Sequence, residues 1–411
     1  MNSNDTNQSG TAKKSARLHY VDWLRVLATL GVFLFHTMLP FDGSIDWMID
    51  NAERSTVVTA IRLFIFQWGM PLFFLLAGAG SCFALRRRTG RQFIDERFGR
   101  LVVPFIISAI LFAPFQTYLQ SIHKGWSDWY TGPFLNLTYL RVYLDSRIGR
   151  GLDDLLNPKV FINFGSHLWF VGYLFVFSLC LLPLFLWLKK DAGKRLISWL
   201  AGLCERRGGI LVVILPLALI RIILQPQAPV YTAWTDFFFM LVFFFSGYIL
   251  FADERFTRVI RRDGKLVLAV GITSLVLVYA AHFSGVGKTW LDSPRTAGFC
   301  FAWSLLSAVA WCWVIIMLYV GMRFLDFTNK WLKYGQQAMM PFYMFHHPVI
   351  IIAFYVVQWN TSAKLGAGTG ILVKLPAVTL GSFAVTLGLT ELVRRIIKPV
   401  RALFGMKARK A

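Results

Sequence analysis

The chain has 411 residues, of which 56% are hydrophobic and only 16% are charged. A soluble domain of this size usually carries about a quarter charged residues, so this composition argues against a soluble protein. The net charge of +22 could indicate a nucleic-acid-binding protein, but the positions of the basic residues, described below, argue against that class as well.

Long apolar runs recur along the chain. A membrane-spanning helix needs roughly twenty mainly apolar residues, and these runs lack the alternating polarity of barrel strands. We therefore predict an all-α membrane protein, with about ten transmembrane helices in a single bundle. In chain order the predicted helices are 18–40, 57–85, 101–120, 167–188, 209–225, 233–252, 265–283, 297–322, 337–357 and 371–396.

These helices form one predicted membrane domain, residues 18–396, between a polar tail (1–17) and a basic tail (397–411). The segments on the side of both tails hold thirty Lys and Arg residues, and the segments on the opposite side hold nine. Because basic residues favour the cytoplasmic side, we expect both termini in the cytoplasm. The longest loop, 121–166, is then extracytoplasmic. Within it, Tyr139 to Leu156 could form an amphipathic helix on the membrane surface.

The first helix carries three residues that are costly in a membrane: Asp22, Arg25 and His36. An offset of eleven residues is almost three helical turns, so Arg25 and His36 share one face and lie about 16 Å apart along the axis. Asp22 lies one turn before Arg25 and can pair with it. The arrangement suits a tunnel between the two membrane sides. The simpler reading is that Arg25 extends to the surface and His36 packs in the core.

Two further groups are candidates. Arg97 and Arg100 precede Pro104 at a cytoplasmic helix end, where paired guanidinium groups can bind phosphates, although the positive-inside bias alone also supplies arginines there. His346 and His347 in the ninth helix, with His167 and Trp169 in the fourth, could form an additional pocket. Interfacial anchoring or core packing explains these four about equally well. No metal-binding motif is present, and we expect no metal.

Three motifs together resemble acyltransferase family 3, a family of integral membrane proteins. Asp22-x-x-Arg25, ten residues, then His36 resembles the family's first helix. The segment from Gly69 to Gly78 resembles its second helix, with Ala77 in place of the usual Ser. Arg97-x-x-Arg100-Leu-x-x-Pro104 resembles the arginine motif of the third. The segments around His167 and His346 look like the branch that contains glucan biosynthesis protein C, a glucan succinyltransferase.

The resemblance implies ten helices and transfer of an acyl group, succinyl or acetyl, from cytoplasmic acyl-CoA to a hydroxyl of an extracytoplasmic glucan or other glycan. It implies His36 as the catalytic histidine, Arg25 (with Asp22) as the essential arginine, and Arg97 and Arg100 as ligands of the acyl-CoA donor. Such a protein would reside in a bacterial inner membrane. Direct transfer and a two-step route through an acyl-histidine both remain open. The alternative from another class is a secondary transporter or flippase for a polar solute, for which the sequence offers no internal repeat.

Overall fold

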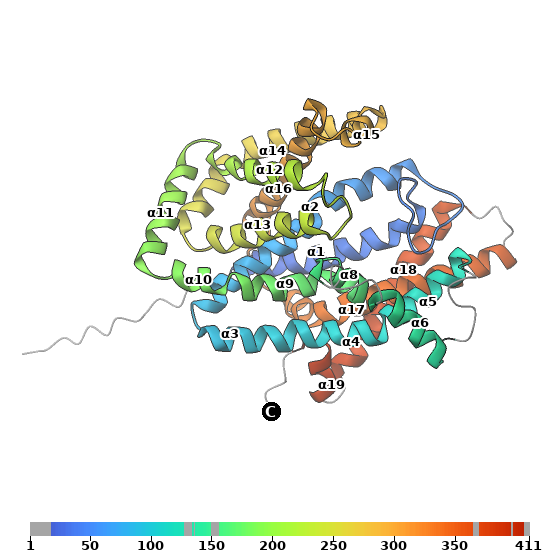
Figure 1. Ribbon diagram of the computed structural model, residues 1–411. Coiled ribbons are helices and arrows are strands. Elements are labelled where there is room, and N and C mark those ends of the chain that lie inside the picture. Colours follow the sequence, from blue (N-terminus) through green and yellow to red (C-terminus); the bar gives the residue numbers. More distant parts are fainter. Residues whose placement is uncertain are drawn as a thin grey trace, which may run out of the picture.

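The computed structural model describes residues 18–126, 134, 136–148, 156–364, 370–395 and 398–406, which fold into helices and connecting segments without a strand (Figure 1). Four short η helices interrupt the α-helices: η1 Leu39–Phe41, η2 Phe98–Val102, η3 Ser166–Leu168 and η4 Gly209–Val213. The α-helices are α1 His19–Met38, α2 Thr56–Leu85, α3 Gly90–Arg97, α4 Val103–Leu111, α5 Ala113–Lys124, α6 Leu137–Ile148, α8 Val160–Gly165, α9 Trp169–Cys180, α10 Leu182–Leu188, α11 Asp191–Glu205, α12 Ile214–Leu224, α13 Trp234–Leu250, α14 Glu254–Phe283, α15 Val286–Leu291, α16 Ala297–Phe324, α17 Lys330–Lys364, α18 Ile371–Arg395 and α19 Lys398–Leu403.

The predicted all-α membrane fold is confirmed. Among the described residues, eight helical segments are long and apolar enough to cross a membrane, and the sharply bent pair α11 and α12 would make a ninth. A further apolar helix, α13, has 17 residues. Each of the ten predicted ranges overlaps one of these segments, although several ends differ, and the range 209–225 is only the second half of the bent pair. The fold is therefore that of an integral membrane protein.

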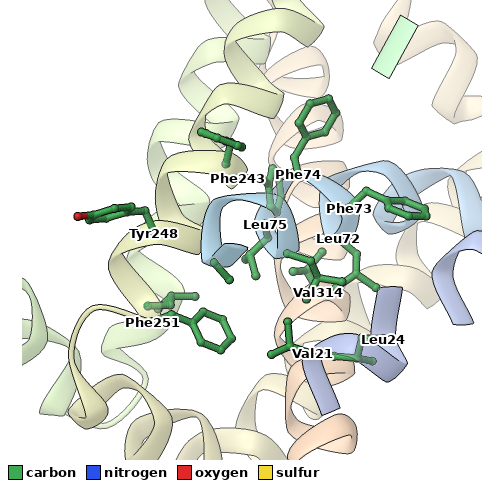
Figure 2. Packing of buried hydrophobic residues seen from close by; sticks show 14 of the residues in the cluster. Val21, Leu24, Leu72, Phe73, Phe74, Leu75, Phe243, Tyr248, Phe251 and Val314 are labelled. Atoms are coloured by element: carbon green, nitrogen blue, oxygen red, sulfur yellow. The ribbon is translucent and has the colours of Figure 1, made fainter. Parts of the chain in front are cut away.

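The core forms where α2 packs against α13, α1 and α16. Glycines allow α2 and α13 to approach closely: a β-carbon at Gly78 would lie 1.9 Å from the carbonyl oxygen of Phe244, and one at Gly247 would lie 1.9 Å from that of Leu75. Small residues at such crossings are typical of membrane helices, because packing rather than hydrophobicity drives helix association in lipid. Figure 2 shows large apolar side chains of all four helices filling the space around this crossing.

The helices α3, α4 and α5 follow one another as one long rod, which runs along the lower edge of Figure 1 with α19 beneath α4. The rod contains a π-helical turn, η2, between Arg97 and Val103. Pro104 has no N–H to donate to the carbonyl of Arg100, and the N–H of Val103 instead reaches back to the carbonyl of Phe98. The resulting turn is wider than an α-helical one, and such turns are frequent at functional sites.

The loop between α5 and α8 contains the helix α6, which covers the first part of the segment expected to be amphipathic. This helix is anchored on α5. Tyr139 and Tyr143 are buried, and the hydroxyl of Tyr139 donates to the carbonyl of Pro114. The expected continuation of the helix across residues 149–155 falls outside the described residues. As far as it is described, this segment packs against the bundle by its tyrosines.

Candidate active site

Three adjoining cavities lie between α1 and α17, and α2 lines two of them. The arginine cavity has a volume of about 780 Å³ and includes Asp22, Arg25, Arg97 and Arg100 in its wall. The connecting cavity, about 270 Å³, shares the three arginines with it. The histidine cavity, about 630 Å³, is lined by His36, His167, His347 and others. Along α1 and α17 the wall residues pass in sequence from the arginine cavity to the connecting cavity and then to the histidine cavity, and α2, which runs in the opposite direction, lines the latter two, so the cavities succeed one another along the bundle.

The arginine cavity collects guanidinium groups from five helical segments. Arg25 comes from α1, Arg97 from α3 and Arg100 from η2, and the C-terminal helices α18 and α19 add Arg394 and Arg401. Carboxylates compensate part of this charge: Asp22 lies 3.7 Å from Arg25, and Glu96 lies 3.3 Å from Arg100. Gln336 and Gln337 of α17 also line the wall. A cavity of this composition suits a large ligand with several negative charges.

Arg25 is held by the backbone of α2. Its Nη2 donates to the carbonyl of Leu76 over 2.6 Å. Gly80 leaves room for this contact, because a β-carbon there would lie 2.6 Å from the same nitrogen and displace it. One turn along, Ser81 donates to the carbonyl of Ala77 and accepts a hydrogen bond of 3.1 Å from Arg97 Nη2. The α2 helix thus fixes two of the three arginines at the mouth of the connecting cavity.

Tyr343 stands between the connecting cavity and the histidine cavity and lines both. Its side chain is buried, and its hydroxyl donates to the carbonyl of His167 over 2.6 Å. Its ring also contacts Phe170, which lines the connecting cavity. The tyrosine therefore forms the partition between the two halves of the site.

Four histidines meet beside the histidine cavity. The ring centres of His36 and His346 lie 5.0 Å apart, those of His36 and His347 lie 4.8 Å apart, and the rings of His167 and His347 stack at 4.8 Å. Pro348 helps to assemble the group, because it cannot donate to the carbonyl of Met344, and that carbonyl accepts from His167 Nε2 at 3.2 Å instead.

The backbone is strained next to His167. Ser166 has a φ of +50°, which is unusual for a residue other than glycine, and it interrupts the helix between α8 and η3. Its hydroxyl donates to Gln116 Oε1 over 2.9 Å. This break directs the chain so that His167 enters the cluster. In the described part of the chain, no group of three or more His, Cys, Asp or Glu side chains is arranged to hold a metal ion.

The rest of the histidine cavity combines aromatic rings with hydrogen-bonding groups. Its wall includes Trp47, Trp169 and Tyr231, and also Gln120 and Asn163. Flat apolar faces next to amides are the surfaces that sugar rings need, because a sugar presents C–H groups on its faces and hydroxyls at its edge.

Two charged groups at the histidine cavity are neutralised by partners. Lys124 donates to Asp46 over 2.5 Å, and this hydrogen bond holds the pKa of the Asp46 carboxyl below its ordinary value. Asp46 is therefore ionised at neutral pH and has no proton to give. Arg62 forms a buried ion pair with Asp42 and a 2.7 Å hydrogen bond to Ser44.

Comparison with known sequences identifies the family. The model of the acyltransferase domain of acyltransferase family 3 matches residues 18–391, nearly the whole chain. The chain belongs to this family. It is similar to the glucans biosynthesis protein C of Escherichia coli O157:H7 (strain EC4115) and to that of Escherichia coli K12, with 23% identity over 372 residues in each case. The alignments cover 87% of this chain and 88% of each relative. No solved structure matches.

Membership of this family identifies the chain as a membrane acyltransferase. The structure of the chain brings the candidate residues from the sequence into two groups. Asp22, Arg25, Arg97 and Arg100 lie together at the arginine cavity. The histidine cavity is lined by His36, His167, Trp169 and His347. His346 is not in the wall of this cavity, but it contacts His36. Arg25 and His36 share a helix but serve different cavities.

Several residues of the site were not predicted. Ser81 and Tyr343 occur in apolar helices, where nothing in the local sequence distinguishes them. Arg401 was assigned to the basic C-terminal tail. Arg147 of α6 reaches the histidine cavity and donates to Thr117 Oγ1 over 2.9 Å. Arg147 could have been recognised as a candidate site residue, because it lies on the side of the membrane that is predicted to be poor in basic residues.

Proposed function

We propose that this acyltransferase moves a succinyl or acetyl group from cytoplasmic acyl-CoA to a hydroxyl group of an extracytoplasmic glucan or other glycan. His36 acts as the general base. The observation that carries this proposal is the succession of an arginine cavity, a narrow connection and a histidine cavity along the same two helices, α1 and α17.

The arginine cavity is the proposed donor site. Coenzyme A carries a diphosphate and a 3′-phosphate, and guanidinium groups bind phosphate oxygens through paired, charge-assisted hydrogen bonds. Arg97 and Arg100 at the wide turn η2 and Arg25 at the neck supply such donors from three directions. In acyl-CoA the thioester is at the opposite end of a flexible arm from the phosphates. A donor held at the arginines therefore extends its thioester through the connecting cavity toward His36, about 16 Å farther along α1.

The histidine cavity is the proposed acceptor site. Its aromatic and amide lining suits a carbohydrate, and the name of the similar Escherichia coli proteins points to glucans. We assign this end of the bundle to the extracytoplasmic side and both termini to the cytoplasm, in a bacterial inner membrane, because the basic residues are concentrated on the side of the termini.

The reaction needs a base because a sugar hydroxyl is a weak nucleophile at neutral pH. His36 takes the hydroxyl proton while the oxygen bonds to the thioester carbonyl carbon. The C–S bond then breaks, and the leaving sulfur of coenzyme A takes the proton from His36. Protons and electrons balance without any further reactant.

The test is acyl transfer by the purified protein in lipid nanodiscs. Acetyl-CoA and succinyl-CoA are supplied separately with a glucan acceptor, and release of free coenzyme A and formation of the glucan ester are both measured. We expect acceptor-dependent turnover with one of the donors. His36→Ala should lower kcat by about 100- to 10,000-fold, as is typical when a general base is removed.

The His36→Ala variant must still bind the donor, and this is measured by displacement of a fluorescent coenzyme A analogue. Turnover that persists at the original rate in a correctly folded His36→Ala variant would exclude His36 as the base. Neither donor binding nor turnover in the unsubstituted protein, over several donors and acceptors, would favour a transporter, and solute flux into proteoliposomes would then be measured.

A further inference from the structure

The hydrogen bonds of His346 define which of its ring nitrogens carries the proton. His346 Nδ1 lies 2.6 Å from the carbonyl oxygen of Tyr343. A carbonyl oxygen only accepts, so Nδ1 must carry a hydrogen and donate it. A neutral imidazole has one N–H, and His346 Nε2 is therefore an acceptor with a free lone pair.

The same reasoning fixes the proton on His36. Its Nδ1 lies 2.9 Å from the carbonyl oxygen of Val32 and 3.2 Å from His346 Nε2. Both neighbours are acceptors, so Nδ1 of His36 carries the hydrogen and shares it between them. The nitrogen left with a lone pair is Nε2 of His36, and this ring lines the histidine cavity.

We propose that His346 is a positioning residue, which orients the His36 ring through the His36 Nδ1–H to His346 Nε2 hydrogen bond and stabilises the cation that His36 becomes during catalysis. This inference rests on the proposed role of His36 as the base. When His36 Nε2 takes the acceptor's proton, the ring becomes positively charged, and its Nδ1–H donates a stronger, charge-assisted bond to His346. When the sulfur of coenzyme A takes that proton, the ring returns to its starting form. His346 keeps its own proton on Nδ1 throughout.

The role resembles that of the carboxylate in a Ser-His-Asp triad, which holds the histidine in the correct tautomer and stabilises its charged form. Here a neutral imidazole does so. Asp46, the acidic residue in the wall of the histidine cavity, is engaged with Lys124. His346 is itself held in place, because it is buried and bonded to the backbone of its own helix.

The first test reads the tautomers directly and does not depend on activity. The chain has seven histidines, so ¹⁵N-histidine labelling gives a spectrum that can be assigned by single substitutions, with the His36 signals identified by their loss in His36→Ala. Solid-state NMR in nanodiscs should show both His36 and His346 protonated on Nδ1. A His36 that is protonated on Nε2 in the unsubstituted protein would overturn the inference.

The second test separates positioning from a merely structural contribution. His346→Leu removes the acceptor, and we expect kcat to fall by about 10- to 100-fold, the loss expected for a hydrogen bond to a charged group. The KM for acyl-CoA should change little. His346→Gln supplies an amide oxygen as acceptor and should restore most of kcat. Moreover, the Nδ1 proton resonance of His36 should move in the Leu variant and return toward its original position in the Gln variant.

Equal losses of kcat in His346→Leu and His346→Gln, with an unchanged His36 Nδ1 proton resonance, would contradict the inference. If the Leu variant does not fold, the Gln variant and the spectrum of the unsubstituted protein still decide the question. Full turnover of His36→Ala would refute the proposed function instead, and the two failures are therefore distinguishable.

Discussion

The arginines of the site differ in how their charge is compensated. Arg62 at the histidine cavity is neutralised by Asp42, and Arg221, another arginine within the membrane, pairs with Asp236 at 3.4 Å and is absent from the walls of the three cavities. Arg147 faces the histidine cavity with a hydrogen bond to the neutral hydroxyl of Thr117, and its buried Nε has no hydrogen-bond partner. Its guanidinium also lies over the ring of Tyr143. Among the described wall residues of this cavity, Arg147 is thus the cation with capacity to bind an anionic group.

We therefore expect Arg147 to favour a donor whose acyl group ends in a carboxylate. Arg147→Leu should lower kcat/KM for succinyl transfer by about 10- to 100-fold, because the carboxylate loses a charge-assisted partner in a site of low polarity. Acetyl transfer should change little. The measurement is kcat/KM with each donor in turn.

Arg141 provides a matched control on the same helix, since it is 84% exposed and pairs with Asp145 at 3.8 Å. Arg141→Leu removes the same charge from α6 outside the cavity and should leave both activities unchanged. An equal loss with both donors in Arg147→Leu would instead assign Arg147 a structural role through Thr117.

At the scale of helices, the C-terminal helix α19 completes the arginine cavity. Gly405, just after α19, approaches the backbone of the wide turn η2, where a β-carbon would lie 3.1 Å from the carbonyl oxygen of Arg100. This close approach holds Arg401 against the cavity that Arg97 and Arg100 line. The helix is therefore part of the proposed donor site.

Arg401→Ala should raise the KM for acyl-CoA by about 10- to 100-fold and leave the KM for the acceptor unchanged, because only the phosphates lose a partner. Arg323, exposed in the last turn of α16 and not part of the three cavity walls, is the comparison. If Arg323→Ala and Arg401→Ala weaken donor binding equally, general attraction between charges accounts for the effect, and α19 is not a specific ligand.

The existence of the helices could be predicted from the sequence, but not all of their ends. Long apolar runs must be helical in lipid, because every backbone group needs an internal partner. The charged segment before residue 265 can bond to water and therefore need not be helical. The helix α14 nevertheless begins at Glu254, because a helix can continue beyond its apolar run where its polar face remains accessible to solvent. The charged face of α1 with Arg25 could be predicted, because a charged residue within a membrane span is rare and costly.

The contacts between helices could not be predicted. That Tyr343 of α17 would bond to the carbonyl of His167, or that Ser81 would accept from Arg97, depends on which helices pack together and in which rotation. A single sequence gives periodicity within a helix but no information on its neighbours. The four histidines were therefore candidates from the sequence, and their convergence is a property of the tertiary structure.

For the whole molecule, the proposed orientation predicts which residues a membrane-impermeant maleimide reaches in intact cells from which any outer membrane has been removed. Asp292 lies in the connection between α15 and α16, and Arg195 lies on α11, and both are exposed. Asp292→Cys should be labelled from outside, and Arg195→Cys only after the membrane is permeabilised. Labelling of the unsubstituted chain, with its five cysteines, gives the background. The reverse pattern would invert the assignment of donor and acceptor sides.

A helix bundle with a cavity toward each side of the membrane must also remain impermeable to ions. Tyr343 lines the cavities on both sides of the division between them, its hydroxyl is bonded to the carbonyl of His167, and its ring contacts Phe170. In the proposed orientation, the side chain between the donor site and the acceptor site is therefore also placed to block leakage of protons through the bundle. An acyl group has to pass Tyr343 without creating a continuous chain of water molecules between the two cavities. This requirement favours acyl groups that are short and compact.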